Sequence, residues 1–87
     1  MKFVYSDSFK KNVSALSKNE KKILKEKLTL LFKNQKHPSL RVKKIKGKKG
    51  IFEASITMDI RMTWQYLKED AILLRKVGKH EKTLKRP

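Results

Sequence analysis

With 87 residues, 38% of them hydrophobic, the chain has room for one compact domain with a modest core, which we expect to span residues 1–87. Its 24 lysines and arginines against eight acidic residues give a net charge of +16, which favours a nucleic acid or an acidic protein as partner. The lack of cysteine excludes disulfides and thiolate chemistry, and two isolated histidines make a poor zinc site, so we expect no metal and no cofactor.

The first part of the sequence predicts a strand followed by two helices. Met1 to Tyr5 reads as a short strand, after which Ser6 or Asp7 can cap a short helix. Ser17 and Glu20 have the spacing of a capping box, which predicts the start of a second, longer helix. The apolar residues at helical spacing in these two helices are Phe9, Val13 and Leu16, then Ile23, Leu24, Leu28, Leu31 and Phe32.

The segment after the second helix predicts turns and irregular structure. Pro38 is expected to end the helix, because the residue before a proline is pushed toward extended geometry. We interpret His37 as a turn residue rather than as a second catalytic group. From Leu40 to Ile45 the apolar spacing indicates an irregular strand or extended arm, and Gly47 and Gly50 bracket a lysine-rich turn.

Three further strands are predicted to fill the rest of the chain. "IFEASIT" and "IRMTWQYL" both alternate, and a hairpin turn at Thr57 to Asp59 joins them. "KED" forms a second turn before "AILLRKV", whose apolar continuity suits a strand with neighbours on both sides. The predicted fold class is therefore α+β, with an N-terminal strand and two helices packed on one face of an antiparallel sheet whose C-terminal strands form a meander.

The face of this sheet that carries no helix is expected to be open and polar. It takes the outward residues of two adjacent strands, Glu53, Ser55, Arg61, Thr63 and Gln65. Phe52, Trp64 and Tyr66 fall in the inward set, so we interpret them as core residues rather than as platforms for stacking bases. A polar face rimmed by lysines suits a phosphate backbone. The lysines expected to bind RNA are Lys43, Lys44, Lys46, Lys48, Lys49, Lys76, Lys79 and Lys82.

This face has the residue types for cleaving RNA without a metal. The reaction needs a base for the 2′-hydroxyl, an acid for the leaving 5′-oxygen and a cation for the charge on the phosphate. Arg61 can hold two phosphate oxygens, and His80, in "KVGKHEK", can give or take a proton near neutral pH. Glu53, Asp59 or Glu81 is available as the base or to orient the imidazole. A lone histidine among lysines is more often a surface residue, so residue types alone leave both interpretations open.

Four segments occur in an order and spacing that resemble a known family, and they are "HPSLRVKKIKG", "GIFEASIT", "DIRMTWQY" and "AILLRKVGKHE". The chain resembles the RelE/ParE superfamily of bacterial toxins from type II toxin–antitoxin systems, and is most similar to the RelE and YafQ branches. The resemblance covers nearly the whole chain. It implies a RelE-like fold and, in those two branches, ribosome-dependent cleavage of messenger RNA that inhibits translation.

The resemblance also implies roles for single residues. Arg61 stands where RelE-like toxins keep the arginine that contacts the scissile phosphate, and Asp59 matches an acidic residue of YafQ-type members. His80 follows "VGK", where YafQ-type members have a histidine used in proton transfer and RelE-type members an arginine. Glu53 and Ser55 depart from the pattern, because RelE has lysines and YafQ a histidine at these positions, and "LKRP" lacks the aromatic residue of those branches. The candidate catalytic residues are Arg61, His80, Asp59 and Glu53, and the identity of the base stays open.

Two other functions fit the same fold, namely a ParE-like toxin that poisons DNA gyrase and a basic RNA-binding module. ParE-like sheets do not need the histidine after the glycine, which favours the nuclease. The resemblance also implies a cognate antitoxin with an acidic segment, and messenger and ribosomal RNA of the ribosomal A site as partners. No apolar run reaches the roughly 20 residues that span a bilayer, and the start lacks a signal-peptide pattern, so we expect a cytoplasmic protein without membrane contact.

Overall fold

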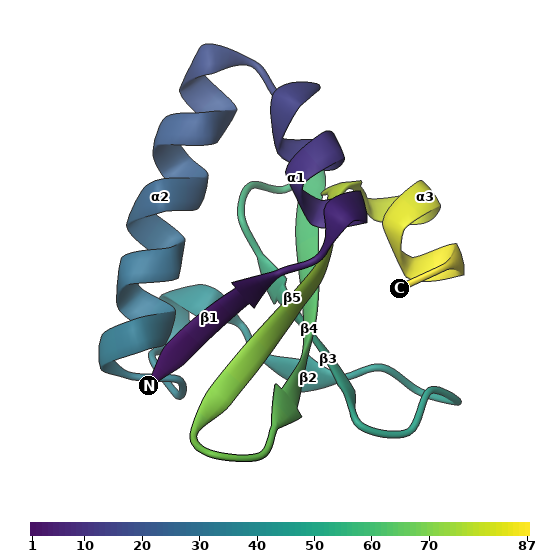
Figure 1. The fold of residues 1–87 in the computed structure, drawn as a ribbon. Helices are drawn as coiled ribbons and strands as arrows, with labels where there is room; N and C mark the ends of the chain where they lie inside the picture. Colours follow the sequence, from purple (N-terminus) through teal and green to yellow (C-terminus); the bar gives the residue numbers. More distant parts are fainter.

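A computed structural model describes residues Met1–Pro87. The elements are β1 (Lys2–Tyr5), α1 (Asp7–Ser14), α2 (Lys18–Lys33), the 3₁₀ helix η1 (Pro38–Leu40), β2 (Lys43–Lys44), β3 (Ile51–Ser55), β4 (Ile60–Leu67), β5 (Ala71–Lys79) and α3 (His80–Lys85). All strands join one sheet in the order β1-β5-β4-β3-β2 (Figure 1). None of the helices is long and apolar enough to cross a membrane.

The predicted α+β class and the C-terminal meander are confirmed, but the sheet is mixed rather than wholly antiparallel. β2, β3, β4 and β5 pair antiparallel in succession, whereas β1 pairs parallel with β5. The connection from β1 to the meander runs through α1 and α2, and a connection of this length lets two strands of one sheet run in the same direction. The strand β5 therefore has a neighbour on each side, as its apolar sequence predicts.

Local hydrogen bonds start the helices where the sequence predicts. Ser6 caps α1, because its Oγ accepts a hydrogen bond of 3.0 Å from the backbone N–H three residues further on. The capping box of α2 is complete, with Ser17 N–H donating to Glu20 Oε1 at 2.8 Å and Glu20 N–H donating to Ser17 Oγ at 3.1 Å. His37 caps η1 by accepting from Ser39 N–H through Nδ1, which confirms it as a turn residue.

The segment between η1 and β3 pairs with the sheet only briefly. Of the expected extended arm, Lys43 and Lys44 alone form the strand β2, opposite residues of β3. Gly47 and Gly50 have φ angles of +81° and +77°, in the left-handed region that glycine adopts at little cost. They turn this exposed, lysine-rich loop back into β3.

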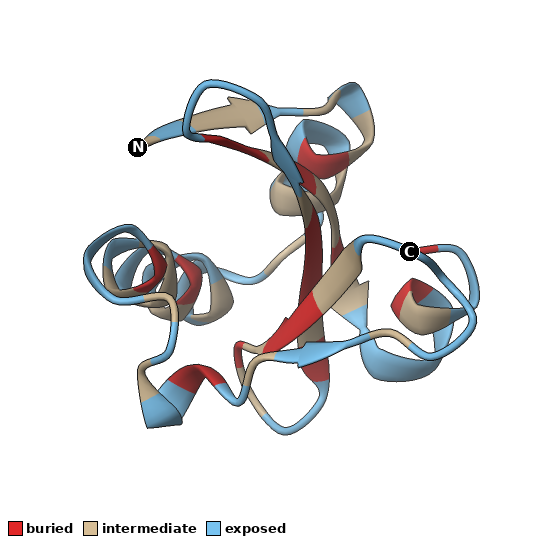
Figure 2. Ribbon diagram, turned by 90° about the horizontal axis from the view of Figure 1, so that it is seen from below, coloured by how far each residue is buried: buried red, intermediate tan, exposed pale blue.

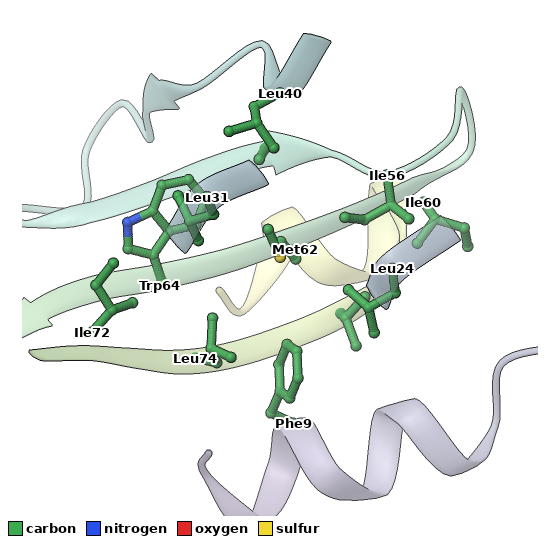
Figure 3. Packing of buried hydrophobic residues seen from close by; sticks show 12 residues of the cluster. Phe9, Leu24, Leu31, Leu40, Ile56, Ile60, Met62, Trp64, Ile72 and Leu74 are labelled. Carbon is green, nitrogen blue, oxygen red and sulfur yellow. The ribbon is translucent and has the colours of Figure 1, made fainter. Parts of the chain in front are cut away.

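The hydrophobic core lies between the sheet and the first two helices. Met62, Trp64 and Leu74 of β4 and β5 have no exposed surface, and Phe9 of α1 and Leu31 of α2 pack over them (Figure 3). The other members of this cluster are Leu24, Leu40, Ala54, Ile56, Ile60, Ile72 and Val77. Burial of these side chains is the main favourable term that holds the helices on the sheet.

The inward aromatic residues differ in burial. Trp64 is fully buried, as predicted, and Phe52 stacks on it with ring centroids 6.1 Å apart. Tyr66 is 43% exposed, so its prediction as a core residue is wrong. The reason is its place near the end of β4, where its hydroxyl donates to Gln35 Oε1 at 2.8 Å and stays near solvent.

The second face of the sheet is covered, which corrects the expectation of an open face. Helix α3 follows β5 directly and lies across the sheet from α2, so that the sheet is sandwiched between them (Figure 2). Thr63 is fully buried there, and its Oγ1 donates to Pro87 O at 2.9 Å. Arg75 Nε donates to the same oxygen at 3.1 Å. The sequence pattern predicts no helix or strand for residues 80–87, yet this segment covers the face.

A glycine in β5 makes this cover possible. A Cβ at Gly78 would lie 3.1 Å from Thr83 Oγ1, tighter than ordinary contact, so the glycine lets α3 approach the strand. Gly78 pairs across the sheet with Arg61, and Thr83 is itself buried. The glycine of "VGK" therefore has a packing role directly opposite a candidate catalytic residue.

Leu74→Ala tests the core. We expect a loss of about 2 to 5 kcal/mol in the free energy of unfolding, because a large buried side chain is removed and a cavity remains. Leu67→Ala, at a leucine of β4 that is 37% exposed, is the matched control and should cost about 1 kcal/mol or less. Urea unfolding followed by circular dichroism measures both, and equal losses would contradict the assigned core.

Thr63→Val tests the cover on the second face. The substitution keeps the side-chain shape and removes the hydrogen bond to Pro87, so hydrogen exchange in α3 should become roughly fivefold faster, given about 1 kcal/mol for one such bond. Thr29→Val removes an exposed hydroxyl bond to Lys25 O within α2 and should leave α3 unchanged. Mass spectrometry of exchanged peptides gives the comparison, and unchanged protection of α3 in both variants would refute the anchoring contact.

Candidate functional site

The β3–β4 turn and the start of α3 enclose a shallow depression of about 360 Å³. Its lining residues are Met58, Asp59, Arg61, Lys79, His80 and Glu81. Three of the four candidate catalytic residues, Arg61, His80 and Asp59, therefore border one space, although His80 is far from the other two in sequence. The depression combines two cations, two carboxylates and an imidazole, which are the groups that an acid–base reaction on a phosphate requires.

Arg61 is oriented by the turn that precedes it. Its Nη1 donates to the carbonyl oxygens of Thr57 at 2.7 Å and Met58 at 2.9 Å, with a longer bond to Ile60 O. These bonds all use one nitrogen, so Nη2 remains for an anion in the depression. The side chain is only 18% exposed, which limits its motion.

Glu53 lies on the predicted face but not in the depression. Its Oε1 is 4.0 Å from Arg61 Nε, and the residue is 6% exposed. Its neighbour across the β3–β4 pair is the buried Thr63. Glu53 is therefore a counter-charge for Arg61 that lies outside the depression.

His80 is held at the edge of the depression by its backbone. It is the first residue of α3, and its N–H donates to Asp59 O at 2.8 Å, which ties the start of the helix to the β3–β4 turn. The His80 side chain is exposed, and Asp59 is exposed beside it. The short distance between these two backbones places the imidazole and the Asp59 carboxylate on the same rim.

The structure distributes the eight lysines predicted to bind RNA over several places. Lys79 borders the depression, and Lys82 borders a separate hollow between α1, α2 and α3. Lys48 and Lys76 line another hollow on the polar side of the sheet. The remaining four are exposed on β2 and its following loop, namely Lys43, Lys44, Lys46 and Lys49.

Three basic residues that the sequence analysis did not select join Lys48 and Lys76, and they are Arg75, Lys85 and Arg86. The signal for Arg75 is present in the sequence. Leu74 and Val77 both face the core although they are three residues apart, a spacing that a regular strand does not allow. Lys85 and Arg86 follow α3, which is too short for its periodicity to be recognised.

The charges of this chain are almost entirely unpaired. Of the 24 lysine and arginine side chains, Arg61 alone has an Asp or Glu carboxylate within 4.0 Å, and the other ion pair joins the N-terminal amine of Met1 to Asp70. No group of three or more histidine, cysteine or acidic side chains gathers in a way that would hold a metal ion. The surface is therefore a source of positive potential with little internal compensation.

Neither a protein-family model nor a curated protein matches the chain, whereas solved structures do. A chain of the E. coli DinJ–YafQ toxin–antitoxin complex is 24% identical over 92% of each chain, with a TM-score of 0.75. A YoeB/ParE toxin from Agrobacterium tumefaciens is 13% identical over 92% of this chain and 99% of that one, with a TM-score of 0.78. A chain of the RelB–RelE antitoxin–toxin complex from Methanococcus jannaschii is 18% identical over 91% of this chain and 92% of that one, with a TM-score of 0.73. The chain thus has the fold shared by the RelE, YafQ and YoeB/ParE toxins.

Proposed function

We propose that this protein is the toxin of a type II toxin–antitoxin system and cleaves messenger RNA as an endonuclease, with residues 1–87 acting as one RelE-like domain. The observation that carries the proposal is the meeting of Arg61, His80 and Asp59 around one depression on a strongly basic chain. The shared fold with RelE and YafQ toxins supports the toxin assignment.

In the proposed reaction, Asp59 accepts the proton of a ribose 2′-hydroxyl, and the 2′-oxygen attacks the neighbouring phosphorus. The bond from phosphorus to the 5′-oxygen breaks, and protonated His80 donates its proton to that oxygen. Arg61 Nη2 and Lys79 stabilise the negative charge on the phosphate oxygens. The products are a 2′,3′-cyclic phosphate and a 5′-hydroxyl, and Glu53 acts behind Arg61 as a positioning residue rather than as the base.

The proposed place of action is the A site of the ribosome in the cytoplasm. The fold measures 32 × 27 × 26 Å and carries a charge of +16, which suits a site walled by RNA phosphates. The exposed lysines of β2 and its loop would bind ribosomal RNA while the depression receives the messenger. Charged loops of this kind also speed association at low salt.

An antitoxin with an acidic segment is the proposed protein partner. The solved DinJ–YafQ and RelB–RelE structures contain a toxin with its antitoxin. In this chain an apolar groove lies between α1 and α2, with Phe9, Val13, Leu24 and Leu28 among its lining residues and lysines at its border. The bordering lysines are Lys10, Lys21 and Lys25. An amphipathic helix with acidic flanks would match this groove in polarity and charge.

Substitution at the depression tests the nuclease assignment. We expect His80→Ala and Arg61→Ala each to slow cleavage of translated messenger in a reconstituted translation system by about 10² or more, because each removes a group that acts in the transition state. His37→Ala is the matched control and should cleave at the rate of the unchanged protein, because His37 caps η1 away from the depression. Primer extension on the messenger gives the rates.

Arg61→Lys separates chemistry from folding. Lysine keeps the charge beside Glu53 but loses the planar fork that bonds both the turn and a phosphate, so cleavage should fall far more than the lost bonds to the turn lower the melting temperature. Full cleavage activity in both His80→Ala and Arg61→Ala would refute the assigned site. Omission of ribosomes from the same assay shows whether they are required.

The gyrase alternative is tested in parallel. Purified protein should leave the supercoiling activity of DNA gyrase unchanged if the chain is a nuclease, because the proposed site acts on a ribose 2′-hydroxyl, which DNA lacks. Inhibition of supercoiling without cleavage of messenger would favour the ParE-like function instead. Harmless overexpression would favour a plain RNA-binding module.

Expression in bacteria tests the toxin–antitoxin assignment. Induction of the chain should arrest growth, and co-expression of the gene beside its own should relieve the arrest, because a bound acidic partner would cover the basic surface. The His80→Ala variant is the matched control and should arrest growth much less at equal protein level. Arrest of equal strength by that variant would separate toxicity from the proposed chemistry.

A further inference from the structure

A second hollow on the polar side of the sheet is lined by five cations and no acidic side chain. We call it the basic hollow, and it has a volume of about 340 Å³. Its basic residues are Lys48, Arg75, Lys76, Lys85 and Arg86, and Ile51 and Pro87 complete its lining. These residues come from the loop before β3, from β5 and from the C-terminal segment, so only the folded chain brings them together.

A bulge in β5 directs two basic residues into this hollow. Thr63 of β4 pairs with Lys76, but the next residue, Trp64, pairs with Leu74, so Arg75 has no partner across the strands. Arg75 donates to Gln65 Oε1 and to Pro87 O, both on the polar side. Bulges of this kind redirect a side chain, and here the consequence is a pair of adjacent cations on one face.

Arg75 has no acidic side chain within 4.0 Å. It donates to Gln65 Oε1 and to Pro87 O, an oxygen of the last residue, and it is half-buried. Four further cations around it add repulsion, which a bound anion would relieve. Its Nη2 makes no hydrogen bond within the protein and can bind an anion such as a phosphate.

We propose that the basic hollow binds a phosphodiester of a single-stranded RNA, as a second phosphate site beside the Arg61–His80 depression. Gln65, which pairs with Ile51 and accepts from Arg75, follows Arg61 by four residues in β4, which is about 13 Å along the strand. The two sites therefore lie along the same strands, where one extended RNA strand can contact both. The inference rests on the proposed function for the identity of the ligand, and adds Arg75, Lys85 and Arg86 to the RNA path.

The test measures binding without cleavage. The probe is a fluorescein-labelled 2′-O-methyl RNA of about 12 nucleotides, which lacks the attacking hydroxyl and fits the usual range of single-strand site sizes. Fluorescence anisotropy gives Kd for the full chain between about 50 and 200 mM NaCl, where the slope of log Kd against log salt reports the phosphates neutralised. We expect Arg75→Gln/Lys85→Gln to weaken binding about 10-fold and to reduce the slope by about 0.7, the value for one phosphate on a single strand.

Two further variants make the result specific. Lys48→Gln/Lys85→Gln leaves Arg75 and its hydrogen bonds in place and should weaken binding similarly, which guards against a folding defect in the Arg75 variant. Lys22→Gln/Lys33→Gln removes the same charge from exposed positions of α2, across the sheet from α3, and should change Kd less than about twofold. Equal weakening by the α2 pair would show non-specific attraction only and would overturn the proposal.

The remaining outcomes distinguish this inference from the proposed function. If the basic-hollow variants bind RNA normally but lose affinity for poly-L-glutamate, the hollow is a protein-docking site and the proposal is wrong. If the unchanged protein fails to cleave messenger but shows the expected binding differences, the nuclease assignment fails while the second phosphate site stands. If the unchanged protein cleaves messenger but both hollow variants bind RNA as tightly as it does, the nuclease assignment stands and the second phosphate site is refuted.

Discussion

Close contact between α3 and β5 is the interaction on which the candidate site depends. Gly78 leaves room for Thr83, and Pro87 O receives hydrogen bonds from Thr63 and Arg75. These contacts hold the C-terminal segment against the sheet and leave the start of α3 at the β3–β4 turn, where His80 bonds to the backbone of Asp59. They act together with the β4–β5 pairing, in which Lys79 lies opposite Ile60 and so brings His80 next to Asp59 and Arg61.

Unbalanced charge is the second constraint, and it opposes the first. A chain with a net charge of +16 and one lysine or arginine near a carboxylate repels itself, so its stability rests on the apolar cluster under α1 and α2. The charges are not neutralised internally, which leaves them available to a polyanion. The same composition that weakens the fold therefore makes tight binding of RNA or of an acidic partner favourable.

One face of the sheet provides the apolar core, and the other carries the polar residues of the candidate site. The face under α1 and α2 is apolar and closely packed, with one buried polar atom left without a partner, Trp64 Nε1. The face under α3 buries polar side chains, among them Glu53 and Thr63, in contact with the C-terminal segment or with Arg61. The bulge at Arg75 joins the two tasks, because it keeps Leu74 and Val77 in the core while two cations stay on the polar side.

Local sequence by itself determined the strands and helices from β1 to β5, and the side of the sheet on which most residues of β3 and β4 lie. Caps at Ser6 and Ser17, turn glycines and strict alternation in β3 and β4 act over a few residues, so their outcome can be predicted without the fold. Tertiary structure alone decided that Glu53 is buried, that α3 covers the polar face and that Arg75 belongs to a basic hollow. These features depend on contacts between segments far apart in the chain, whose energies no local pattern contains.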